Sequence, residues 1–250
     1  MKTGRVLGMA AAFAGVEALA ITVRGDDWWP SPSGRFHVET RPSPSKGQDR
    51  LLHASFSYRA SKLSWFAWRW ACLSETASAW LGAATGIAIG LPKEIGDGFQ
   101  PDKGFDLADM GWTAAGAIIP ALHRTWPETR IVLLKSNYWP SDEFLNRTGD
   151  LPQLENDYAG QRYYLAINPG RLSSGAGPWP DWLGFAVGHS VPHWISRPPV
   201  HQWYVTLDLN LRGLPIEGTW WRWAAAFLDQ VHVPFPGIRI QEGEVKLGLF

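Results

Sequence analysis

Residues 80–112 read WLGAATGIAIGLPKEIGDGFQPDKGFDLADMGW, and this stretch decides how the first half of the chain folds. The part up to Gly90 is apolar or small, and the remainder carries charged side chains around glycine bends. Gly82, Gly86 and Gly90 recur every four residues, so they share one face of a helix. Each glycine weakens a helix in water by about 1 kcal/mol, but this spacing lets a second helix backbone approach closely in a membrane. We therefore expect a glycine-packed helix at membrane depth, with a tightly packed soluble helix as the alternative.

The next helix signal, residues 106–123 (DLADMGWTAAGAIIPALH), has the same small-residue character. Asp106 and Asp109 stand at its start, where acidic side chains cap a helix and favour its dipole. We expect Gly111 and Gly116 to pack against a neighbouring helix.

The helical half, which we place at residues 1–125, contains two further predicted helices, one at residues 49–73 and one at the N-terminus. Residues 49–73 (DRLLHASFSYRASKLSWFAWRWACL) carry apolar side chains at helical spacing, as in an amphipathic helix that lies along an interface. A loop rich in proline and serine at residues 30–48 precedes this helix. Cys72, the single cysteine, excludes an internal disulfide and a thiolate metal cage, and we expect it to be a small apolar filler.

The N-terminus combines Lys2 and Arg5 with an apolar run over residues 6–23. The run is just long enough for one tilted membrane span, and Trp28 and Trp29 follow it as an interfacial belt would. We interpret the run as a retained signal anchor with a cytoplasmic N-terminus; a cleaved signal peptide is the alternative. The helical half is thus expected to be a membrane-associated bundle of about four helices.

Residues 126–250 change to strand patterns, so we expect an α+β chain with a strand-rich, Trp-rich second half. In residues 201–211 (HQWYVTLDLNL) an apolar set beginning at Trp203 alternates with a second set beginning at Tyr204, the signature of a half-buried strand. Further strands are predicted within residues 130–138, 160–170 and 182–191, and in a C-terminal hairpin that turns at Glu242 and Gly243. Residues 217–231 predict a short helix whose Trp220, Trp221 and Trp223 suit an interface.

Composition limits the classes of function. Lys+Arg and Asp+Glu both number 23, so the formal net charge is zero and no nucleic-acid partner is expected. Charged residues make up 18%, against about 25% in ordinary soluble domains, and the 16 Trp favour places such as bilayer interfaces. These features predict membrane lipid and other subunits of a membrane protein complex as partners, and no cofactor.

A set of charged residues lies at the ends of the predicted helices. It consists of Asp49, His53, Lys93, Glu94, Asp97, Asp106 and Asp109. We interpret this set as a structural polar clamp that fixes the helix ends without a bound metal. The alternative is a metal-dependent or acid–base centre whose catalytic candidates are His53, Glu94, Asp97 and Asp106. The chain has no HExxH, GxSxG or phosphate-loop motif that would specify a reaction.

Three segments in this order carry a resemblance: DRLLHASFSY (49–58), SETASAWLGAATGIAIGLPKEIGDGF (74–99) and GFDLADMGWTAAG (104–116). They resemble the YfiM-like family of bacterial envelope proteins, in the long form typical of Bacteroidetes and relatives, and more distantly VanZ-like membrane proteins. The motif positions that the resemblance implies are Asp49, His53, Lys93, Glu94, Asp97, Asp106 and Gly116. The chain departs from the family pattern in three places. Arg50 replaces a lysine, Asp109 follows Asp106 by three residues rather than four, and residues 187–194 (VGHSVPHW) lack the family's usual tyrosine-glycine pair. The family brings no established activity.

The expected function is therefore non-enzymatic. We predict an accessory or scaffold subunit of a larger membrane complex, respiratory or photosynthetic, in the bacterial cell envelope. The helical half would lie in the inner membrane and the strand-rich half in the periplasm; a periplasmic or outer-membrane-associated protein is the alternative location. The alternative functions are an envelope hydrolase or lipid-modifying enzyme with a His/carboxylate site, and a small-molecule binding protein.

Overall fold

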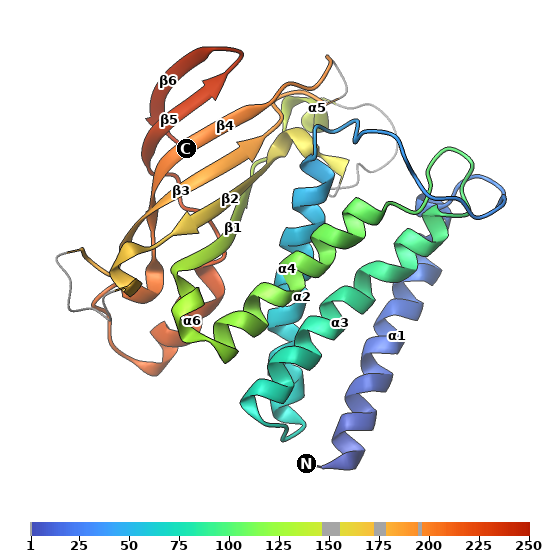
Figure 1. The fold of residues 1–250 in the computed structure, drawn as a ribbon, viewed down its shortest axis with the longest axis horizontal. Coiled ribbons are helices and arrows are strands. Elements are labelled where there is room, and N and C mark those ends of the chain that lie inside the picture. Colours follow the sequence, from blue (N-terminus) through green and yellow to red (C-terminus); the bar gives the residue numbers. More distant parts are fainter. Residues whose placement is uncertain (1, 147–155, 173–178, 195–196) are drawn as a thin grey trace. The chain divides into compact units, whose positions relative to one another are not determined.

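The computed structural model describes residues 2–146, 156–172, 179–194 and 197–250 (Figure 1). The chain divides into two compact units, Met1–Pro42 with His53–Pro127, and Ser43–Leu52 with Glu128–Phe250. The first unit is helical and the second contains a six-stranded antiparallel sheet, so the predicted α+β class is confirmed. Residues 43–52, which we had placed in the helical half, belong to the sheet unit.

Four long helices dominate the first part of the chain: α1 (Thr3–Trp28), α2 (Gln48–Trp70), α3 (Glu75–Asp97) and α4 (Leu107–Thr125). Ser74 caps α3 by accepting a hydrogen bond from the amide of Ala77, and Asp106 caps α4 by accepting from the amides of Ala108 and Asp109. Helix α3 continues through Pro92, so its last turn carries the charged residues that follow the glycine segment.

Glycines bring α3 and α4 close to α2. A Cβ atom on Gly82 would lie 2.7 Å from the carbonyl oxygen of Ser61, and one on Gly86 would lie 2.9 Å from that of Ser57. On α4, a Cβ on Gly116 would lie 2.0 Å from the carbonyl oxygen of Ala54. These contacts exist because glycine lacks a Cβ, so the packing predicted from the spacing is present.

Two of the predicted glycines behave differently. Gly90 faces the side chain of Thr113 on α4 rather than α2. Gly111 has open space at its Cβ position, so the prediction that it packs against a helix was wrong. Gly111 falls on the exposed side of α4, whereas Gly116 lies on the buried side.

Among the described helices, α1 is the one long and apolar enough to cross a membrane, with a mean hydropathy of 2.0 over its best window. None of its residues is buried. A signal sequence would have the same character, so α1 is a membrane span or a signal sequence by length and composition. Helices α3 and α4, which we expected at membrane depth, do not reach this level of hydropathy.

The end of α2 corrects one prediction. Cys72 is exposed and adopts a left-handed backbone conformation, with φ of 64°, just after the helix. It therefore takes part in the turn between α2 and α3 and does not fill the core.

The sheet unit is an antiparallel meander in which the strands follow chain order. Its strands are β1 (Val132–Tyr138), β2 (Gln161–Ile167), β3 (Leu183–Ser190), β4 (Gln202–Leu209), β5 (Pro236–Gln241) and β6 (Glu244–Leu249). Short helical segments connect them: η1 (Pro127–Ile131), α5 (Asp142–Leu145), η3 (Tyr158–Gly160), η4 (Pro169–Leu172), η5 (Leu211–Gly213) and α6 (Thr219–Leu228). The predicted hairpin turn is confirmed, because Glu242 and Gly243 both have positive φ, as a two-residue type I′ turn requires.

The polarity of the two sheet faces is the reverse of the usual arrangement on β4. Strand β4 is half-buried as predicted, but its buried face carries Tyr204, Thr206 and Asp208, while Trp203 and Val205 are exposed. The buried face also includes a hydrophobic cluster with three aromatic rings, formed by Leu133, Tyr164, Ala166, Ala186, Tyr204 and Phe250. Among the described residues, the sheet thus buries the polar set of β4, while its apolar side chains are exposed on several strands and Leu134 of β1, on the same face, is buried.

Candidate functional site

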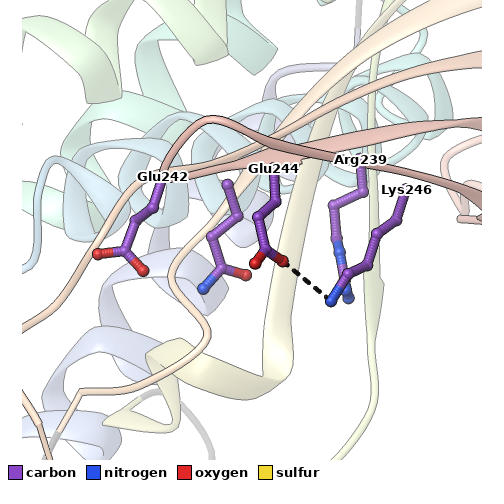
Figure 2. A pocket seen from close by; sticks show the side chains of 5 residues that line it. Arg239, Glu242, Glu244 and Lys246 are labelled. Atoms are coloured by element: carbon purple, nitrogen blue, oxygen red, sulfur yellow. Dashed lines mark ion pairs between the residues drawn. The ribbon is translucent and has the colours of Figure 1, made fainter.

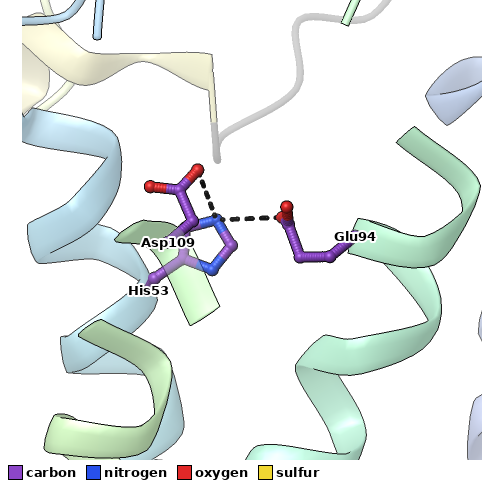
Figure 3. A group of neighbouring side chains, drawn as sticks. All are labelled: His53, Glu94 and Asp109. Carbon is purple, nitrogen blue, oxygen red and sulfur yellow. Dashed lines mark ion pairs between the residues drawn. The ribbon is translucent and has the colours of Figure 1, made fainter. Parts of the chain in front are cut away.

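Three helices of the first unit bring His53, Glu94 and Asp109 together (Figure 3). His53 lies on α2, Glu94 in the last turn of α3 and Asp109 in the first turn of α4. One ligand atom from each residue lies within 4.8 Å of the other two. The contact of Gly116 with Ala54 draws α4 against the turn of α2 that carries His53, so the glycine packing positions the cluster.

Both nitrogens of the His53 ring have polar neighbours. Nδ1 lies 3.1 Å from Oγ1 of Thr113, which is buried on α4. Nε2 lies 3.6 Å from Oε1 of Glu94 and 3.8 Å from Oδ2 of Asp109. The Thr113 contact has hydrogen-bond length, whereas the two carboxylate separations are longer than an ordinary hydrogen bond.

A second group of charges lies beside the cluster. Lys93 Nζ is 2.8 Å from Oδ2 of Asp97, and Lys103 Nζ is 3.1 Å from its Oδ1. Lys103 also donates to the carbonyl oxygen of Trp28 at the end of α1. Asp97 therefore connects the end of α3 to the following loop and, through Lys103, to the end of α1.

Glu94 has an unusual environment. Its side chain is almost fully buried, which raises the pKa of its carboxyl group to about 7 because burial penalises the charged form, although nearby Lys93 lowers it. A carboxyl group with this pKa can gain or lose a proton near neutrality. The backbone amide of Asp106 points to Oε2 at 3.4 Å, a weak interaction.

Asp49, also predicted as part of the clamp, has its hydrogen-bond partners in its own unit. Its Oδ1 accepts hydrogen bonds from the hydroxyls of Ser43 and Ser45, at 2.8 and 2.7 Å, within the segment assigned to the sheet unit. The loop before α2 therefore supplies the hydrogen-bond partners of Asp49. Asp106 acts as the cap of α4.

The predicted interface tryptophans divide into two groups. Trp28 and Trp29 are half-buried, and a Cβ on Gly96 would overlap the Trp29 ring, so Trp29 packs against α3. Trp220 and Trp223 are exposed on α6, whereas Trp221 is half-buried.

The sequence did not reveal a buried charged network in the sheet unit. Lys135 on β1 is fully buried and lies 2.8 Å from Asp208 and 3.3 Å from Asp229. His232 Nδ1 is 2.9 Å from Asp208, and its ring stacks on Tyr164. The available signal was Lys135, which follows three apolar residues in the predicted strand VLLKSNY. A lysine on the buried face of a strand needs a paired acidic group.

A depression on the C-terminal hairpin is also polar. It is lined by Arg239, Gln241, Glu242, Glu244 and Lys246 (Figure 2). Lys246 and Glu244 form an ion pair of 3.2 Å, and both side chains are largely exposed. Opposite charges alternate along this surface and are open to solvent, so it favours no single sign of ligand.

Comparison with known protein families, curated proteins and solved structures gave no match. The resemblance to the YfiM-like family therefore remains a prediction from the quoted motifs.

Proposed function

We propose that the protein is a non-enzymatic, membrane-anchored envelope protein that acts as an accessory or scaffold subunit of a larger membrane complex. The observation that carries this proposal is the open apolar face of the sheet. Helix α1 would anchor the chain, and the sheet unit would dock onto another subunit. An energy-transducing complex, respiratory or photosynthetic, is the host expected from the sequence.

The apolar face is continuous across five strands. Leu165, Val187, Val205, Ile238 and Leu247 pair in one register row from β2 to β6. The exposed fractions are 45% for Leu165, 48% for Val187 and 85% for Leu247. Phe185 and Ile167 extend the face on β3 and β2. Contiguous exposed apolar surface of this kind marks an interaction site.

A protein partner fits this face better than the hydrocarbon of a bilayer. Within the described residues, the outer edge of β6 has no strand partner, so its backbone groups need water or protein to satisfy them. Open sheet edges do not occur in the hydrocarbon region of a membrane. A subunit that covers the apolar face while the edge stays solvated meets both requirements.

Helix α6 offers a second apolar surface in the same unit. Trp220, Trp223 and Phe227 are exposed and recur at three and four residues, so they form one stripe. Tryptophan is enriched at protein interfaces and at the wet edge of membranes, because its ring has an apolar body and a polar N–H. This stripe supports a location close to a membrane surface.

Co-purification after mild detergent extraction tests the proposal. The wild-type chain is expected to leave the membrane together with a large complex. The double variant Val187→Lys/Leu247→Lys places two charges on the apolar face and is expected to remain in the membrane fraction but to purify alone. Lys246→Gln, on the opposite face of β6, is the matched control and should co-purify as the wild type does. Unchanged co-purification of the double variant would overturn the proposal.

A second candidate function, an envelope hydrolase or lipid-modifying enzyme, is favoured by one observation. Buried Glu94, with its pKa near 7, faces His53 on a different helix, as an acid–base pair could. His53→Ala and Asp97→Ala separate the two functions. If the cluster is a clamp, folding and assembly decline together in both variants; an enzyme would give a folded, assembled His53→Ala chain that lacks a hydrolytic activity on membrane lipids shown by the wild type.

A further inference from the structure

We propose that His53, Glu94 and Asp109 bind one divalent transition-metal ion, of the Zn²⁺ class, that ties together α2, α3 and α4. This inference goes beyond the proposed scaffold function and does not depend on it. It rests on the spacing of three side chains, the orientation of one ring and the local balance of charge.

The spacing suits an ion better than direct contact. Zn²⁺ binds imidazole nitrogen and carboxylate oxygen at about 2.0–2.2 Å, so neighbouring ligand atoms around it lie about 3–3.6 Å apart. The His53 Nε2 atom lies 3.6 Å from Glu94 and 3.8 Å from Asp109. These two separations from the imidazole exceed a hydrogen bond by several tenths of an ångström and approach the distances between ligands that share one ion. The ligand atoms of all three residues lie within 4.8 Å of one another.

The orientation of His53 gives independent support. A metal-binding histidine usually directs its other ring nitrogen to a hydrogen-bond acceptor, which fixes the ring and its tautomer. Here the hydroxyl of Thr113, from outside the ligand set, lies 3.1 Å from Nδ1. When Nδ1–H donates to that hydroxyl, the lone pair of Nε2 faces two carboxylates. A cation between the three groups turns this repulsive arrangement into a favourable one.

The local charges also call for a cation. Glu94 and Asp109 are both buried. Lys93 Nζ is 3.9 Å from Glu94 and also interacts electrostatically with Asp109, but the closest carboxylate contacts of Lys93 and Lys103 are made with Asp97. Buried carboxylates need pairing, a proton or a metal. Lys93 offsets part of this negative charge, and a divalent ion would offset the rest.

The ligand types select the metal. One imidazole with two carboxylates suits Zn²⁺ and its first-row neighbours, whereas Ca²⁺ and Mg²⁺ prefer all-oxygen sites. Because each ligand comes from a different helix, the ion would act as a cross-link of the bundle. Water would complete its coordination.

Metal titration of the full-length chain in detergent tests the inference. The purified protein is stripped with a chelator and titrated with Zn²⁺, and in parallel with Co²⁺, whose visible spectrum reports nitrogen and oxygen ligands. We expect one ion per chain and a rise in the melting temperature of the helical unit with Zn²⁺, and no such rise with Ca²⁺ or Mg²⁺. Absence of binding by the folded, stripped wild-type chain would overturn the proposal without the need for a variant.

Matched variants locate the site. His53→Gln and Asp109→Asn should abolish the Co²⁺ spectrum and the thermal response, while His37→Gln, an exposed histidine of the same unit, should leave both unchanged. Thr113→Val keeps the side-chain shape, removes the hydroxyl that orients His53, and should weaken affinity by about 10–100-fold. Equal binding by the wild type and His53→Gln would place the ion elsewhere and contradict the assignment.

Discussion

The ammonium group of Lys135 lies 2.8 Å from Oδ2 of Asp208, and neither side chain is more than 3% exposed. The pair joins β1 to β4 across the buried face of the sheet unit. Asp229 and His232 extend it, since Asp229 lies 3.3 Å from the lysine and His232 lies 2.9 Å from Asp208. A charged network therefore occupies a position that an apolar core would fill in most sheets of this size.

Lys135→Met is expected to destabilise the sheet unit strongly. The substitution leaves Asp208 and Asp229 buried without their lysine, and breaking a buried pair costs about 3–5 kcal/mol. Urea unfolding followed by tryptophan fluorescence measures the change. Lys246→Met is the matched control, because its ion pair is exposed and such pairs contribute at most about 1 kcal/mol. Equal effects of the two substitutions would contradict the role assigned to the buried network.

Alanine at two glycines of α4 should have opposite effects. Gly116→Ala places a Cβ 2.0 Å from the carbonyl oxygen of Ala54, and overpacking of this kind costs about 3 kcal/mol. Gly111→Ala meets open space and should stabilise the helix by about 1 kcal/mol, because alanine favours helix more than glycine does. Thermal unfolding followed by circular dichroism compares them. A destabilising Gly111→Ala would show that this face of α4 is covered.

The stability of the sheet unit should depend on the protonation of His189. Burial, with a contribution from His201, lowers the pKa of His189 to about 4 from an ordinary 6.5. Between these values the unfolded chain binds the proton and the folded chain does not. The free energy of unfolding is therefore not reduced by His189 above pH 6.5. It falls by up to about 3 kcal/mol as the pH is lowered toward 4, because the folded state resists protonation of this residue.

Urea midpoints at pH 7.5 and pH 5 measure this loss, and His189→Gln isolates it from the effect of the carboxylates. Glutamine can keep hydrogen bonds with Gln48 and His201 but does not titrate. The variant should show a smaller fall in stability between the two pH values than the wild type. An identical fall would mean that His189 does not contribute.

Charges in α1 should release the chain from the membrane. Val16 and Leu19 are 60% and 63% exposed, so Val16→Arg/Leu19→Arg should leave the packing of the helical unit intact. Each arginine near the centre of a span costs about 2.5–3.5 kcal/mol of insertion free energy. We expect the double variant to move from the alkali-resistant membrane fraction to the soluble fraction. Asp26→Arg, which lies outside the apolar run, is the control and should stay in the membrane fraction. Release of the wild-type chain by alkali, or an N-terminal sequence that begins after α1, would argue for a cleaved signal.

Local patterns predicted the elements well. The Asp106 cap of α4, the glycine spacing of α3 and the turn at Glu242 and Gly243 all depend on a few neighbouring residues, and each is present in the structure. The charged cluster was predicted only as a set of residues. The sequence could not show that Glu94 and Asp109 face His53, because that arrangement depends on how three helices are placed against each other. The bonds of Asp49 to Ser43 and Ser45 are local.

The sequence by itself determined where the helices and strands lie, because caps, turns and periodicity act within a few residues. The tertiary structure alone decided which side of each element is buried. In β4 a period of two separates Trp203 and Val205 from Tyr204 and Asp208, but it does not say which set the rest of the chain covers. The buried partners of Asp208 come from β1 and from the segment after α6, far away in sequence. The same holds for His53, Glu94 and Asp109, whose helices meet because Gly82, Gly86 and Gly116 allow the backbones to touch.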